Sequence, residues 1–300
     1  MTIFSLTNSL TNSLSNDWLA EVTAIARQTA WGAAEILRSY YRGEPDYEAL
    51  QIQEKTEGPV TAADLAVNQY ILNNFQAAFG TTEFAYLTEE TYKSSSAAIL
   101  TQPWVWIIDP LDGTRDFIDK TGEYAIHIAL VHEQRPIVAV VAQPEAETVY
   151  FAWLGGGTFR ETKDGSLTPV KVSDRASIDE LALVASRTHR DERFNQLLSH
   201  IPFKSKNYVG SVGCKIITII EQQTDVYISL SGKSAPKDWD MAAPELILTE
   251  AGGNFTAADG TALQYNTGDV NQWGCLIASN GKVHDPLCDQ ITTTLAKIDG

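Results

Sequence analysis

The chain has 300 residues, of which 44% are hydrophobic, which is enough for one large domain or two packed subdomains with a real core. Its 38 acidic and 22 basic residues give a formal charge of −16, which argues against binding to nucleic-acid polymers and against docking onto anionic membranes. The cysteines Cys214, Cys275 and Cys288 have no zinc-site spacing, so free thiols in a reducing, cytoplasmic compartment are the simplest interpretation.

The first 80 residues predict a tail followed by two helices. Residues 1–16 are rich in Ser, Thr and Asn and have no basic residue, which predicts a flexible tail rather than a secretory signal or a membrane-inserting segment. Apolar residues at near-helical spacing then predict a helix over 18–41, with Asp17 as a candidate cap, and a second helix over 62–79. Residues 42–58, between these helices, predict a loop or an irregular hairpin.

Strand-type patterns follow the two helices. They predict strands at 84–87, 104–108, 124–132, 137–143 and 148–153. The last three indicate an antiparallel meander, and Gly155-Gly156-Gly157 is interpreted as a plain hairpin turn.

After residue 180 the composition changes and helices alternate with strands. The patterns predict strands at 181–186, 226–229 and 273–278, and helices at 191–200, 214–223, 241–251 and 286–298. Such alternation indicates an α/β or α+β chain with mixed sheets. The composition break suggests an N-terminal subdomain of residues 17–180 and a C-terminal subdomain of residues 181–300.

The segment Asp109-Pro110-Leu111-Asp112-Gly113-Thr114 carries the strongest chemical signal. The apolar run 104–108 precedes it, so a buried strand is predicted to stop at Asp109 and to present two carboxylates from a turn. The D-x-x-D spacing brings both carboxylates and the Leu111 carbonyl near one point, and an all-oxygen cluster suits a hard cation such as Mg²⁺. Gly113 and Thr114 would offer N–H groups and a hydroxyl to a neighbouring anion. An ordinary type I turn explains the hexapeptide alone equally well.

Three more acidic residues lie at the ends of predicted elements. Glu89 follows the strand at 84–87, Asp64 lies in the first turn of the second helix, and Asp240 begins the helix at 241–251. Taken singly, Asp64 and Asp240 fit the helix dipole, and Glu89 fits a surface charge.

Together, three separated strings resemble the inositol monophosphatase superfamily over roughly residues 20–280. These strings are Leu87-Thr88-Glu89-Glu90, Asp109-Pro110-Leu111-Asp112-Gly113-Thr114, and Trp239-Asp240-Met241-Ala242-Ala243 followed by Glu250-Ala251-Gly252-Gly253. The resemblance implies a layered α-β-α-β-α sandwich with two mixed sheets between helix layers. It also implies a metal-dependent, lithium-sensitive phosphatase.

The resemblance implies roles for individual residues. The ligands of two or three Mg²⁺ ions would be Glu89, Asp109, the Leu111 carbonyl, Asp112 and Asp240. Asp64 and Thr114 would orient or deprotonate the attacking water, and the N–H groups of Gly113 and Thr114 would hold phosphate oxygens.

Further segments resemble the bisphosphate nucleotidase branch of this superfamily. Residues 109–118 are similar to its D-P-L-D-G-T-K-E-F-I pattern, whereas inositol monophosphatases more often have D-P-I-D-G-T-T-N-F. Ser186-Arg187-Thr188-His189 resembles S-R-S-H, and residues 210–215 resemble G-S-S-x-K. The resemblance implies hydrolysis of the 3′-phosphate of adenosine 3′,5′-bisphosphate. An inositol-1-phosphatase or a broad sugar-phosphate phosphatase of the same fold is the alternative, and a non-enzymatic relative is a third.

The expected partner is a small phosphorylated substrate. The sequence leaves open whether the chain forms a homodimer. A substrate with a second phosphate needs a second cationic partner, for which Arg187, Lys215 and Lys233 are the candidates. Arg187 and Lys215 would equally fit a solvated surface.

Overall fold

The computed structural model describes residues 14–44, 52–55, 58–92, 98–188 and 190–300. Most of the predicted tail, part of the loop predicted at 42–58 and His189 lie outside the described residues. Within these ranges, no helix combines the length and the apolar character that crossing a membrane requires.

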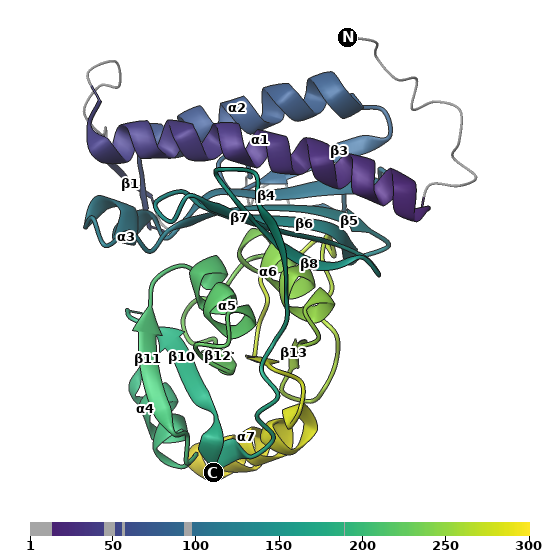
Figure 1. The fold of residues 1–300 in the computed structure, drawn as a ribbon. Coiled ribbons are helices and arrows are strands. Elements are labelled where there is room, and N and C mark those ends of the chain that lie inside the picture. The colour runs from purple at the N-terminus through teal and green to yellow at the C-terminus, as the bar shows by residue number, and fades with distance from the viewer. Residues whose placement is uncertain (1–13, 45–51, 56–57, 93–97, 189) are drawn as a thin grey trace.

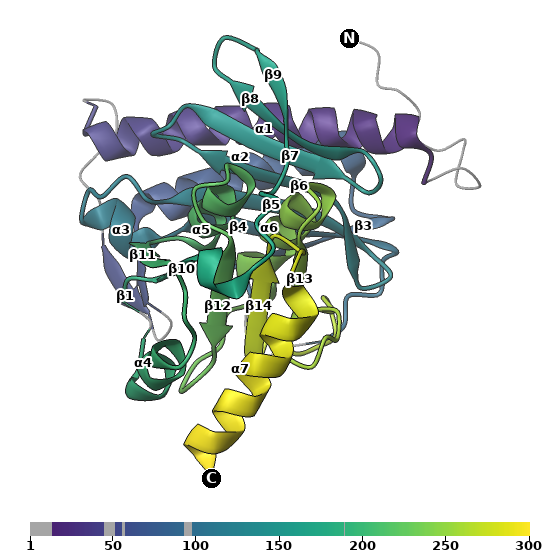
Figure 2. The ribbon, with the colours of Figure 1, turned by 60° about the horizontal axis from the view of Figure 1, so that its bottom comes forward.

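Five layers stack in the order helix, sheet, helix, sheet, helix (Figure 1). The helical layers are pairs: α1 (Asn16–Arg42) with α2 (Ala62–Phe79), α5 (Val212–Ile220) with α6 (Asp238–Glu250), and α4 (Glu192–Ser199) with α7 (His284–Asp299). Figure 2 shows α5 and α6 between the α1–α2 layer and α7. This arrangement confirms the predicted sandwich with two mixed sheets between helix layers.

The first sheet has seven strands in chain order. They are β3 (Phe84–Thr88), β4 (Trp104–Asp112), β5 (Ala125–His132), β6 (Arg135–Gln143), β7 (Thr148–Trp153), β8 (Gly157–Thr162) and β9 (Leu167–Val170). β3 and β4 are parallel, and the other neighbours are antiparallel. The predicted meander is confirmed, but it omitted β8 and β9, because their largely exposed or half-buried residues lack a clear apolar pattern.

The second sheet has five strands in the order β11-β10-β12-β14-β13. They are β10 (Ala182–Ser186), β11 (Ser205–Val209), β12 (Val226–Leu230), β13 (Asn254–Ala257) and β14 (Cys275–Ser279). β10 pairs in parallel with β11 and β12, whereas β14 is antiparallel to both neighbours. The sequence did not predict β11, which is exposed at almost every position, or the four-residue β13.

β5 shows how the seven-stranded sheet serves two cores. Ile126, Ile128 and Leu130 pack in the core under α1 and α2, whereas Ala125 and Ala129 belong to the core that contains α6. Alternate residues of a strand face opposite sides of the sheet, so the three large side chains named here meet one layer and the two alanines meet the other. Small side chains on the second face let α6 approach the sheet closely.

The cap of α1 differs from the sequence-based prediction, whereas the segment before α2 agrees with the predicted loop or irregular hairpin. Ser15 rather than Asp17 caps α1, because its side chain accepts a hydrogen bond from Trp18 N at 3.3 Å while Asp17 lies in the first turn. The loop region before α2 contains a short antiparallel hairpin of β1 (Gln53–Lys55) and β2 (Gly58–Val60).

Candidate active site

The sequence predicted that the strand stops at Asp109. This prediction is wrong, because β4 continues to Asp112 with an irregular register. Asp109 pairs with His127 and Asp112 pairs with Ala125, so β4 has one residue more than β5 over this stretch. Pro110 has no N–H for a regular ladder, and the extra residue makes a β-bulge. The bulge ends β4 with two carboxylates close to one another.

The third carboxylate comes from the other half of the chain. Asp240 lies in the first turn of α6, where its Oδ2 accepts a hydrogen bond from Lys237 N at 2.6 Å. One side-chain oxygen from each of Asp109, Asp112 and Asp240 lies within 4.8 Å of the others. Glu89, directly after β3, interacts with the Asp109 side chain. The structure therefore brings together the four carboxylates that were predicted as metal ligands.

Three of these carboxylates are held in an environment that disfavours their charge. Burial, followed by the charges of Asp240 and Glu90, raises the pKa of Glu89 to about 8. Burial and then the Glu89 charge raise the pKa of Asp109 well above its ordinary value. Burial and then Asp112 raise the pKa of Asp240 to about 6. A buried set of oxygen donors with excess negative charge fits a hard divalent cation such as Mg²⁺.

Asp112 behaves differently from its neighbours. Burial alone would raise its pKa, but His127, Lys215 and Ser211 outweigh that effect and hold the pKa below its ordinary value. Its Oδ2 accepts hydrogen bonds from three donors at the start of α5: Ser211 Oγ at 2.6 Å, Val212 N, and Gly213 N at 3.1 Å. Asp112 thus stabilises the N-terminus of α5 in addition to facing the carboxylate cluster.

Asp64 and Thr114 meet beside the carboxylate cluster. Thr114 Oγ1 lies 3.3 Å from Asp64 Oδ1 and 3.1 Å from the Leu111 carbonyl, and it can donate to either. The other Asp64 oxygen accepts from Thr61 N at 2.8 Å and from the Thr61 hydroxyl, in a capping box at the start of α2. Burial, opposed in part by Thr61, raises the pKa of Asp64 to about 6. Asp64 therefore has a helix-capping role and also a basic oxygen at the site.

Gly113 connects β4 to the short helix α3 (Thr114–Ile118). Its φ of +93° lies in the left-handed region, where glycine is favoured. A Cβ at this position would lie 3.0 Å from the Glu123 carbonyl. The chain therefore needs glycine here to turn from the carboxylates of β4 into the first N–H groups of α3.

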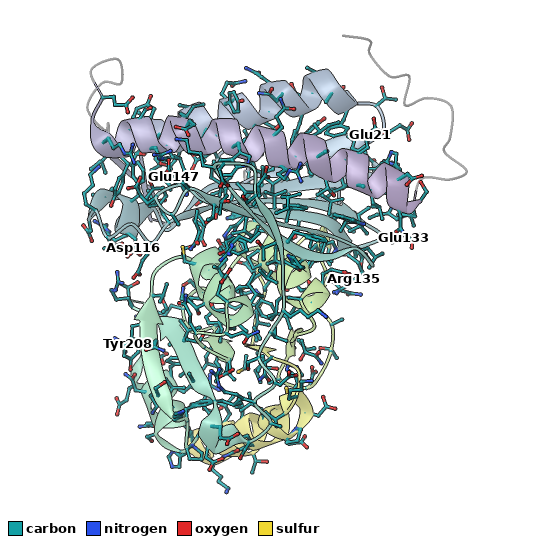
Figure 3. The ribbon with its side chains drawn as sticks, viewed as in Figure 1. Glu21, Asp116, Glu133, Arg135, Glu147 and Tyr208 are labelled. Carbon is teal, nitrogen blue, oxygen red and sulfur yellow. The ribbon has the colours of Figure 1, made fainter. Side chains whose placement is uncertain are left out.

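The three predicted basic residues occupy different environments. The Arg187 guanidinium donates to Asp116 Oδ1 at 2.6 Å and to Glu123, across the boundary between α3 and the end of β10. Figure 3 shows Asp116 at α3, on the side that faces β11. Lys215 is buried, and its ammonium donates to the carbonyls of Gly210 and Ser211 at 3.1 and 2.9 Å. Lys233 is exposed in the loop before α6.

Sequence reasoning assigned no role to two residues of the site, His127 and Ser211. His127 is buried on β5, and its Nε2 lies 3.2 Å from Asp112 Oδ2. Its signal in the sequence was a single imidazole inside the apolar run 125–131. Ser211 was quoted only as part of a motif, and its backbone φ of +42° and its contact with Asp112 need the fold to be seen.

Comparison of the sequence with known protein families identifies the family of this chain. The family described as "Inositol monophosphatase family" matches residues 18–295. The chain belongs to this family. Its members are phosphatases, and the predicted superfamily resemblance is thereby confirmed.

Two curated relatives narrow the comparison. The chain is 29% identical to the 3′(2′),5′-bisphosphate nucleotidase CysQ of Aggregatibacter actinomycetemcomitans over 84% of this chain and 89% of that protein. It is 30% identical to the protein of the same name from Salmonella typhimurium, over 79% of this chain and 91% of that protein.

A solved structure supports the fold. The extragenic suppressor protein suhB of Bartonella henselae superposes with a TM-score of 0.74 at 24% identity, covering 90% of this chain and 98% of that one. At this identity the likeness concerns the fold alone.

Proposed function

We propose that this family member is a Mg²⁺-dependent phosphomonoesterase that removes the 3′-phosphate of adenosine 3′,5′-bisphosphate by attack of an activated water. The observation that carries the proposal is the convergence of Asp109, Asp112 and Asp240 within 4.8 Å, with Asp64 and Thr114 joined at 3.3 Å nearby. The substrate is supported by the two relatives named as 3′(2′),5′-bisphosphate nucleotidases.

The donor set fits Mg²⁺, and two or three ions are proposed. The residues that would hold them are Glu89, Asp109, the Leu111 carbonyl, Asp112 and Asp240. Bound Mg²⁺ would neutralise phosphate charge, lower the pKa of a coordinated water and stabilise the leaving oxygen. The raised pKa values of Glu89 and Asp240 mean that the folded chain alone disfavours full ionisation of this cluster, which a cation would restore.

Asp64 and Thr114 are proposed to position the nucleophile. Thr114 Oγ1 donates its proton toward Asp64 or the Leu111 carbonyl, which leaves a hydroxyl lone pair that can accept a hydrogen bond from water. Asp64, with a pKa of about 6, is predominantly ionised at neutral pH and close enough to neutrality to act as a general base. The N–H groups of Gly113 and Thr114, at the start of α3, would hold phosphate oxygens.

Arg187, Lys215 and Lys233 are proposed to select a substrate with a second phosphate. Lys233 is exposed and can contact a ligand directly. Arg187 is already paired with Asp116 and Glu123, and Lys215 with two backbone carbonyls, so direct contact by either would require these bonds to open. The test therefore begins with Lys233.

The substrate test compares kcat/KM for adenosine 3′,5′-bisphosphate and inositol 1-phosphate, with the nucleotide product identified as the 5′-monophosphate. The wild-type protein should prefer the bisphosphate and lose its activity in excess EDTA. Lys233→Ala should lower kcat/KM for the bisphosphate by about 10-fold or more, the range for a charge-assisted hydrogen bond, and change that for inositol 1-phosphate much less.

A wild-type preference for inositol 1-phosphate would move the assignment to the inositol-phosphate alternative. Full activity in EDTA would contradict the metal mechanism. Equal losses on both substrates would remove Lys233 from the specificity site.

A further inference from the structure

The imidazole of His127 lies between Asp112 and the backbone of Trp239, the residue before Asp240. Its Nδ1 lies 3.3 Å from the carbonyl of Trp239, in the first turn of α6, and its Nε2 lies 3.2 Å from Asp112 Oδ2. A carbonyl can only accept, so Nδ1 is the donor in the first contact. The second contact has the distance of an ion pair but not the alignment of a hydrogen bond. Trp239 directly precedes Asp240, so one side chain connects the surroundings of two carboxylates from different parts of the chain.

We propose that His127 is a positioning residue that sets the separation of Asp112 and Asp240 for metal binding. This inference rests on the proposed metal-dependent function. The donors of α5 surround Asp112 Oδ2, and the His127 ring lies against the same oxygen. The other oxygen of Asp112 would then be the one left to hold a cation. Outer groups that orient metal ligands commonly change metal affinity by about 10-fold to 100-fold when they are removed.

The packing around His127 gives independent support. His127 lies on the α6-facing side of β5, between Ala125 and Ala129, whose small side chains leave room for a ring. Gly213, in the first turn of α5, lies against the edge of this ring formed by Nε2 and Cδ2. A Cβ on Gly213 would be 2.3 Å from His127 Nε2, closer than real Cβ contacts allow. The absence of a side chain at Gly213 therefore leaves the space that the His127 imidazole occupies.

Gly213 also allows His127 to be displaced without being mutated. Gly213 has no positive φ, so alanine is compatible with its backbone and improves helix propensity by about 1 kcal/mol. Gly213→Ala should nevertheless push the imidazole away from Asp112. His127→Ala should remove the same obstacle and make room for the new methyl group. A smaller clash with Val141 Cγ1, at 2.9 Å, concerns packing and not the carboxylates.

The experiment is a double-mutant cycle read by Mg²⁺ titration. The unfolding temperature of each full-length variant is followed against Mg²⁺ concentration, which yields a half-saturation concentration without any substrate. A purely structural role would lower the unfolding temperature in EDTA but leave this concentration unchanged. His127→Ala and Gly213→Ala should each raise it by about 10-fold or more. The double variant should be within about twofold of His127→Ala, because both changes remove the same contact.

His132 provides the matched control on the same strand. It also contacts a backbone carbonyl through Nδ1, that of Pro103 at 2.9 Å, but it lies at the opposite end of β5. His132→Ala should leave the Mg²⁺ half-saturation within about twofold of the wild type.

A wild-type Mg²⁺ half-saturation concentration in both single variants would overturn the inference. So would a double variant in which Gly213→Ala raises this concentration as much as it does in the wild-type background. If His127→Ala does not fold, Gly213→Ala alone decides the question, since it favours the helix. A wild-type protein that does not respond to Mg²⁺ at all would instead overturn the proposed metal mechanism, and this inference with it.

Discussion

The fold shifts the pKa values of Asp112 and Asp240 in opposite directions, although the sequence presents both residues as equivalent candidate ligands. Asp240 lies among negative neighbours, and burial followed by Asp112 raises its pKa. For Asp112, His127, Lys215 and Ser211 lower the pKa against the effect of burial, and the first N–H groups of α5 donate to its Oδ2. Loss of charge should therefore have opposite consequences for stability at these two positions.

In EDTA, Asp112→Asn should be less stable than the wild type by about 1–3 kcal/mol, because the start of α5 loses a charged acceptor. Asp240→Asn should be equally stable or more stable, because repulsion in the cluster falls and the amide oxygen can still accept from Lys237 N. Urea unfolding measures both. At saturating Mg²⁺, both variants should lose turnover by orders of magnitude. Equal stability changes in the two variants would contradict the assignment of Asp112 to α5.

Asp64→Asn should separate metal binding from hydrolysis. The amide can keep an acceptor toward Thr61 N, so α2 should retain its cap. The loss of a basic oxygen should lower kcat by about 10²–10⁴-fold, the usual contribution of general acid–base groups. Turnover and the Mg²⁺-dependent rise of the unfolding temperature check the two halves of this prediction. Near wild-type kcat would exclude Asp64 as the base.

At the scale of elements, the start of α3 depends on a backbone conformation as much as on side chains. Gly113→Ala should destabilise the protein by more than about 1–2 kcal/mol, because it adds a close approach to the Glu123 carbonyl to the cost of positive φ. It should also lower turnover by displacing the N–H groups of α3. Gly260→Ala is the matched control, since Gly260 has a φ of +82° with no atom within 4 Å. Equal stability costs and unchanged turnover in both variants would show that the space around Gly113 is unimportant.

Elements with strong apolar patterns could be predicted from the sequence. Features that depend on contacts with distant parts of the chain could not. β4 and β5 are apolar over most of their length and were found, but the bulge after Asp109 depends on the register with β5. The convergence of Asp240 with Asp109 was inferred from the family resemblance and not from the pattern of residues. The sequence did not predict the burial of Lys215, although α5 is apolar apart from Lys215 and Thr218, which is typical of an internal helix.

At the scale of the molecule, the site lies where β4 and β5 of the first sheet meet α5 and α6 of the middle layer. The raised pKa values of its acidic residues make the stability of the whole protein depend on pH. Groups such as Glu89, with a pKa of about 8, and Asp238, raised mainly by burial to about 7, bind more protons in the folded state than in the unfolded chain. Their contribution is complete at low pH and is lost as the pH rises through the folded pKa.

Without metal, the unfolding temperature should therefore fall between about pH 6.5 and about pH 8.5. Below that window His284 acts in the opposite direction, because burial lowers its pKa and its protonation opposes folding. Saturating Mg²⁺ should reduce the slope, since the cation stabilises the ionised carboxylates. Calorimetry in EDTA and in Mg²⁺ measures both slopes. A metal-free stability that rises with pH across this window would contradict the assigned environments.

The middle layer also has a consequence for synthesis on the ribosome. Val105, Ile107 and Ala139 of the first sheet are covered in the finished protein by the core that α6 completes. β9 ends at Val170 and α6 ends at Glu250, so 80 residues separate the last strand of that sheet from its cover. At about 5–20 residues per second, the nascent sheet would wait roughly 4–16 s with an apolar face open. We expect this interval to be the period in which the growing chain most needs chaperone protection.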